Sequence, residues 1–133
     1  TFVYDTEPAC RALVVARELD ATKAWGFVHA LQQAFYVGVE DVTHAAVLMR
    51  IAESAGYPVD AFGAHFDQQE MREKTLADVS WVADLGMAGL PILLAERDGQ
   101  LALLANGYQA AEQVLPLLAR WVTAGEKRGE VLA

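Results

Sequence analysis

The chain has 133 residues, of which 54% are hydrophobic and 21% charged, and its formal net charge is −8. This length suits a globular domain with its own core, and the composition excludes an intrinsically disordered chain. No apolar run reaches the ~18 residues of a membrane span. An acidic surface without a Lys/Arg cluster also disfavours nucleic acids and membrane surfaces as partners.

The first half of the chain predicts amphipathic helices. The segment "EPACRALVVARELD" (7–20) predicts the first, with Pro8 in its first turn, where proline is tolerated. Cys10, Leu13 and Val14 follow helical spacing and indicate its apolar stripe. The segment 21–38 predicts a second helix that ends at Gly38. The expected inward face of this second helix consists of Ala24, Val28, Leu31 and Phe35, flanked by Trp25 and Phe27.

Three further helices are predicted before residue 87. One spans 44–56 with Thr43 as its cap, and a short one spans 61–67 with Asp60 as its cap. A longer helix spans 68–86. The expected inward residues are Leu48, Ile51, Ala52 and Ala55 in 44–56, and Met71, Thr75, Val79 and Val82 in 68–86, the last set flanked by Leu76 and Ala83.

A β-hairpin is predicted next. The strands "ILLAE" (92–96) and "LALLA" (101–105) are joined by "RDGQ", in which Asp98–Gly99 suits a tight reversal. Both strands are apolar nearly throughout, which is typical of strands covered on both faces. Because an isolated two-stranded hairpin is marginal in water, this one requires neighbouring strands that the 133 residues do not encode.

The segment 108–125 predicts a final helix, and Pro116 predicts a kink or break near residues 112–116. Its inward residues are expected to be Val114, Leu117, Leu118, Trp121 and Val122.

The sequence offers few groups for catalysis. It contains one cysteine, Cys10, so no disulfide forms within the chain, and its place on the apolar stripe near Glu7 predicts a buried structural thiol. The histidines His29, His44 and His65 do not have metal-ligand spacing, and no serine elbow or phosphate-binding loop is present. We expect no metal, no cofactor and no catalytic residue in this chain.

The order of these elements resembles the C-terminal part of a DsbA-like member of the thioredoxin superfamily. The most specific part is "LGMAGLPILLAERDGQ", with a glycine-x-x-glycine-x-proline loop at Gly86, Gly89 and Pro91, and "YDTEPACRALVVAREL" resembles the start of the inserted helical domain. The resemblance implies a mostly helical α+β fold. Residues 1–68 would form the helical insertion, and residues 69–133 the long helix, cis-proline loop, hairpin and terminal helix.

The resemblance also implies roles for single residues. Pro91 would be the cis-proline, and Leu90 and Gly89 would join it in a substrate-binding wall, with Gly86 and Gly89 permitting a tight approach. The chain departs from the family in two respects. Ile92 stands where many relatives carry threonine. The first strand, the Cys-x-x-Cys motif, the helix behind it and the next strand have no counterpart.

The implied function is a part of a thiol–disulfide oxidoreductase that supplies the substrate wall and helical cap and is redox-inactive alone. Its partners would be thiol or disulfide substrate proteins or glutathione, and a homodimer could form through the open hairpin edge. A cytoplasmic location is expected. Two alternatives stay open: a glutathione-dependent kappa-transferase or hydroxychromene-carboxylate-isomerase-like enzyme with serine in place of the reactive cysteine, and a non-enzymatic helical interaction module.

Overall fold

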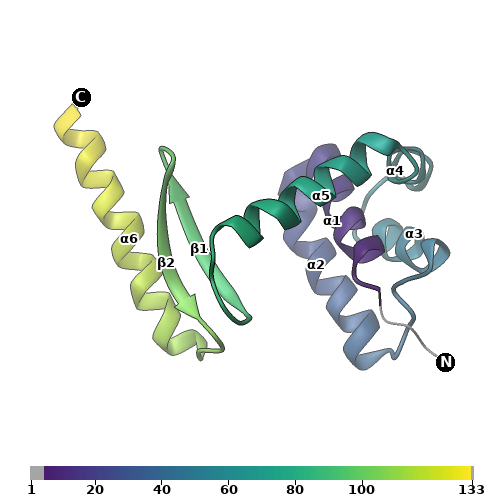
Figure 1. The fold of residues 1–133 in the computed structure, drawn as a ribbon, viewed down its shortest axis with the longest axis horizontal. Coiled ribbons are helices and arrows are strands. Elements are labelled where there is room, and N and C mark those ends of the chain that lie inside the picture. Colours follow the sequence, from purple (N-terminus) through teal and green to yellow (C-terminus); the bar gives the residue numbers. More distant parts are fainter. Residues whose placement is uncertain (1–4, 133) are drawn as a thin grey trace. The chain divides into compact units, whose positions relative to one another are not determined.

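The computed structural model describes residues 5–132 and is mostly helical (Figure 1). Within these residues the sheet has two antiparallel strands, so the predicted class, a mostly helical α+β fold, is confirmed. The chain forms two compact units, which divide after Leu85. Each unit is described by itself below.

Helices make up the first unit. Its first helix, α1, begins where the Glu7 amide donates to Asp5 Oδ1 (3.0 Å), and it carries a proline in its first turn. The elements are α1 (Glu7–Asp20), the 3-10 turn η1 (Ala21–Lys23), α2 (Ala24–Gln32), the π-helical turn η2 (Gln33–Val37), α3 (Ala45–Ser54), α4 (Val59–Phe66) and α5 (Gln69–Asp84).

An aromatic cluster forms the centre of this unit. The rings of Phe27 and Tyr57 lie 5.7 and 5.5 Å from that of Phe62, which is fully buried. The Tyr57 hydroxyl donates to the Asp20 carbonyl at 2.9 Å, so this polar group is satisfied at the edge of the core. Ala12, Val15, Leu48 and Ile51 complete the core around the rings.

The predicted inward face of α2 is wrong by part of a turn. Phe27 is fully buried, whereas Trp25 is 80% exposed, and Leu31 is only half-buried. The ring of Phe27 fills the space between Tyr57 and Phe62 and thereby fixes the rotation of the helix. The wider turn η2 then shifts the helical phase, so that Ala34 rather than Phe35 is buried.

Both predicted helix caps are also wrong. The Thr43 hydroxyl donates to Asp41 Oδ1 (2.6 Å) instead of serving α3, whose N-cap position is His44. Asp41 Oδ1 also accepts a hydrogen bond from the Thr43 amide (3.0 Å). These two bonds form a local turn that competes with helix capping by Thr43. Asp60 lies inside the first turn of α4, where a carboxylate interacts favourably with the helix dipole.

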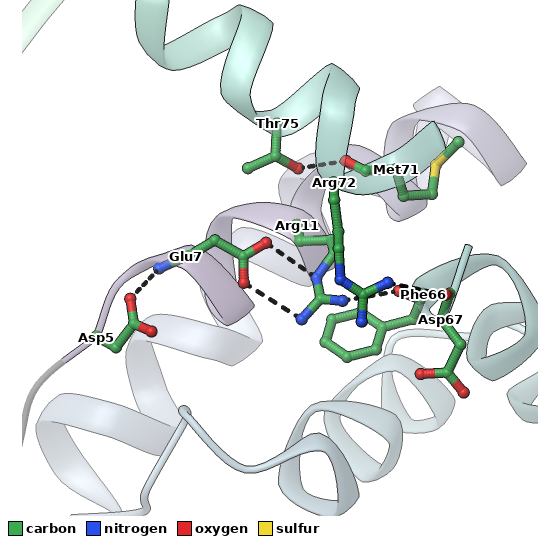
Figure 2. A network of polar contacts seen from close by, with 8 residues as sticks. All are labelled: Asp5, Glu7, Arg11, Phe66, Asp67, Met71, Arg72 and Thr75. Atoms are coloured by element: carbon green, nitrogen blue, oxygen red, sulfur yellow. Dashed lines mark hydrogen bonds and ion pairs between the residues drawn. The ribbon is translucent and has the colours of Figure 1, made fainter. Parts of the chain in front are cut away.

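A buried arginine connects α1 with the turn between α4 and α5 (Figure 2). Arg11 donates from Nη1 to the Phe66 carbonyl (3.1 Å) and from Nη2 to Glu7 Oε2 (3.2 Å). Its guanidinium also lies over the Phe66 ring, 4.0 Å from the ring centre. Arg72 donates to the Asp67 carbonyl at 2.8 Å. These bonds satisfy the carbonyls that the end of α4 leaves free.

The long helix α5 is buried along its first half only. Met71 and Thr75 are buried, and Lys74 pairs with Glu18 of α1 at 2.7 Å. The predicted inward positions farther along, Val79 and Val82, are about half exposed. This part of the prediction is wrong: in the second half of α5, α1 makes a polar contact, the exposed ion pair of Arg17 with Asp78 (2.5 Å), and Val79 and Val82 stay uncovered.

The second unit contains β1 (Ile92–Arg97), β2 (Gln100–Asn106) and α6 (Ala111–Leu132). The hairpin is confirmed, with Arg97 opposite Gln100. Its two turn residues, Asp98 and Gly99, have φ values of 53° and 74°, the left-handed pair that an Asp-Gly turn favours. A bulge that the sequence did not indicate shifts the register between Leu93 and Leu94.

The helix α6 runs through Pro116 without a break, and the predicted alternative, a kink, stays a prediction. Pro116 lies early in the helix, so its missing N–H and its ring affect only the first turns. Of the predicted inward residues, Val114, Leu117, Leu118 and Trp121 are half-buried, whereas Val122 is 40% exposed.

Arg97 joins the hairpin to α6. It donates from Nη1 to the Trp121 carbonyl (3.1 Å), and its guanidinium lies over the Trp121 ring, 4.1 Å from the centre. A Cβ at position 125 would lie 1.1 Å from Arg97 Nη1, so Gly125 leaves the room that the guanidinium occupies. On the strands, Leu101 and Leu103 are about half exposed. One face of the hairpin is therefore largely uncovered within this unit.

The division after Leu85 differs from the predicted domain boundary after residue 68. The difference concerns α5, which is compact with the first unit through its contacts with α1. The boundary at 68 follows the resemblance rather than compactness, and it stays a prediction.

Candidate functional site

The loop between α5 and β1 is the candidate site. The last turn of α5 closes with a bond from the Leu85 amide to the Trp81 carbonyl (3.2 Å). The peptide bond between Leu90 and Pro91 is cis, the form that the resemblance implies. The Pro91 carbonyl accepts a hydrogen bond from the Gly107 amide (2.8 Å). This bond joins the end of the loop to the residue that follows β2.

Two glycines give the loop its path. Gly86 and Gly89 have φ values of 65° and 88°, a conformation that side-chain-bearing residues rarely adopt. No atom lies within 4 Å of the position that a Cβ would take at either residue. The backbone conformation therefore requires glycine at both positions, and the tight approach that the resemblance implies for this loop stays a prediction.

The tip of the loop is open to solvent. Leu90 is 83% exposed and Pro91 is also exposed, so the backbone and an apolar side chain are available for a contact. The segment "LGMAGLP" contains no ionisable residue. The loop can bind and orient an extended chain, but it cannot transfer a proton or act as a nucleophile.

Cys10 is exposed, so the prediction of a buried thiol is wrong. The adjacent Arg11 is buried instead, because its long apolar stem packs inward while its guanidinium is satisfied by Phe66 and Glu7. The pKa of the Cys10 thiol is raised, first by partial desolvation and then by the carboxylates of Glu7, Asp5 and Asp78. A reactive cysteine needs the opposite shift, so this thiol is poorly suited to be a nucleophile.

The histidines make local contacts only. His44 Nε2 lies 3.1 Å from Asp41 Oδ2, and His65 Nδ1 lies 2.9 Å from the Ala61 carbonyl, while His29 is exposed. Across residues 5–126, whose side chains the structure describes, no group of three His, Cys, Asp or Glu residues is arranged to hold a metal ion. In the same part of the chain, no helix is both long and apolar enough to cross a membrane.

One strained residue escaped the sequence analysis. Val39 has φ 54°, which is unusual for a β-branched residue, and it directly follows Gly38 at the end of η2. Nothing in the pattern "YVGVED" distinguishes Val39 from Gly38 as the left-handed position, so no sequence signal could have found it.

Comparison with known proteins bears on the fold of the chain. No family model and no curated protein matches the chain. Among solved structures, a "putative protein disulfide isomerase from Nitrosomonas europaea" is similar, with a TM-score of 0.86 and 38% sequence identity. The match covers 92% of this chain and 60% of that chain. The fold is thioredoxin-like. This thioredoxin-like chain spans only about 60% of the length of the solved protein that it matches.

Proposed function

We propose that this thioredoxin-like chain is the substrate-wall and cap portion of a DsbA-like thiol–disulfide oxidoreductase. The observation that carries the proposal is the exposed Leu90–Pro91 tip, which precedes β1 in a chain 38% identical to a protein described as a putative disulfide isomerase. The wall would comprise Gly89, Leu90 and Pro91. Its ligand would be an extended segment of a thiol- or disulfide-containing protein, or glutathione.

The redox chemistry requires groups beyond this chain. In thiol–disulfide exchange a thiolate attacks a disulfide sulfur, which forms a mixed disulfide and releases a thiolate, and a second thiolate then resolves the intermediate. Cys10 is the one cysteine in these 133 residues, and its raised pKa keeps it protonated at neutral pH. We therefore propose that the intact protein carries its cysteine pair in a preceding segment.

Uncovered apolar surface supports this view. In the first unit the end of α5 exposes Leu76 and Val79, and in the second unit the hairpin exposes Leu101 and Leu103. Surfaces of this kind favour burial against further elements. Additional strands and a helix from the same protein would bury them.

The decisive experiment extends the protein upstream of Thr1 and measures oxidation and reduction of a dithiol peptide. If the added segment contains Cys-x-x-Cys, the longer protein should be active, and serine at its first cysteine should abolish the activity. Cys10→Ser is the matched control and should leave the rate unchanged. A charged substitution at the wall, Leu90→Asp, should raise KM for the peptide more than it lowers kcat.

Two outcomes would overturn the proposal. A segment with serine in place of the motif, together with conjugation of glutathione, would establish the transferase-like alternative. A start codon just upstream of Thr1, with no added domain, would establish a non-enzymatic helical module.

For the isolated chain we further propose a homodimer in which the free edge of β1 or β2 pairs with a second copy. Unpaired strand edges present backbone donors and acceptors in a row, and the apolar Leu103 lies beside them. Sedimentation equilibrium should show the dimer. Leu103→Lys should dissociate it, and Trp25→Lys, a change at a more exposed apolar residue in the other unit, should not. A monomeric wild-type chain at high concentration would refute this assembly.

A further inference from the structure

No further inference is drawn: the strongest candidate, the exposed apolar run Tyr36–Val39 that closes η2 in the helical unit, carries nothing because no part of the structure shows what covers it.

Discussion

The two units of this chain differ in how many large apolar side chains each buries in its own core. The helical unit has a closed core in which Phe27, Phe62 and Leu48 are fully buried. In the described part of the hairpin unit, the buried residues are Ala95, Leu104 and Ala105, two of them alanines. Burial of a large side chain contributes about 1.5–3 kcal/mol, and burial of alanine far less. The hairpin unit therefore has much less buried apolar surface to stabilise its fold.

The contrast also separates folding from function. The candidate wall lies in the hairpin unit, where few apolar contacts hold the backbone in place. The helical unit contributes packing and carries no group suited to the proposed chemistry. A binding loop on a weakly stabilised element gains order when its neighbours and its ligand are present.

The largest expected effect is a difference in hydrogen exchange between the units. At a concentration at which the chain is monomeric, amides in the middle of α1 and α4 should exchange at least about 10²-fold more slowly than amides of β1 and β2, because local opening costs range from near zero to the global value. Mass spectrometry of peptides from the intact chain gives the measurement. Equal protection in both units would mean that the hairpin unit is stable on its own.

The next effect compares two aromatic residues of α2. Phe27→Ala should lower the free energy of unfolding of the helical unit by about 3–5 kcal/mol, because it removes a fully buried ring. Trp25→Ala should change it by less than about 0.5 kcal/mol, since this ring is 80% exposed. Urea unfolding followed by circular dichroism measures both. A larger loss for Trp25→Ala than for Phe27→Ala would mean that α2 buries the side that carries Trp25.

The same contrast explains which features the sequence could predict. The hairpin and the glycine loop depend on local chemistry, such as the Asp98–Gly99 turn and the positive φ at Gly89, and local chemistry is visible in a sequence. The rotation of α2 depends on Tyr57 and Phe62, which are distant in the chain, so the spacing of apolar residues left the choice between Phe27 and its neighbours open.

The errors about Cys10 and about the end of α5 have the same origin. Arg11 counts as polar in any sequence pattern, yet it is buried because Phe66 provides both a carbonyl and a ring for its guanidinium. The helical stripe was therefore assigned to Cys10 instead. The end of α5 was expected to face inward because Val79 and Val82 are apolar, yet both side chains are about half exposed.

A smaller effect tests how the hairpin is joined to α6. Alanine in place of a helix glycine is ordinarily stabilising by about 0.5–1 kcal/mol, so Gly125→Ala should stabilise the second unit when Arg97 is already replaced by alanine. In the wild-type background it should instead be neutral or destabilising, because the added Cβ displaces the guanidinium from Trp121. We expect a coupling free energy of about 1 kcal/mol between the two substitutions. Hydrogen exchange of the hairpin amides in the four proteins of the double-mutant cycle measures it. Additive effects would show that Arg97 contributes nothing at this contact.

The smallest effect concerns Cys10. Its pKa is raised by partial desolvation and by nearby carboxylates, so the thiolate forms only at a pH above that of an ordinary thiol. The rate of Cys10 alkylation by iodoacetamide should therefore rise only at a pH higher than that at which an ordinary thiol begins to react. Glu7→Gln should move the midpoint down by less than about one pH unit, since an ion near solvent acts weakly. Glu53→Gln is the control, because Glu53 is not among the groups that act on this thiol.

The sign of the linkage gives a second test of the same group. A pKa that is higher in the folded chain than in the unfolded chain means that the folded state favours the neutral thiol. The contribution of Cys10 to stability is therefore fully present below the unfolded pKa and is lost as pH rises through the folded pKa. Cys10→Ser should remove this part of the alkaline decrease in stability. A midpoint below that of a free thiol would reverse both expectations and would make Cys10 a candidate nucleophile.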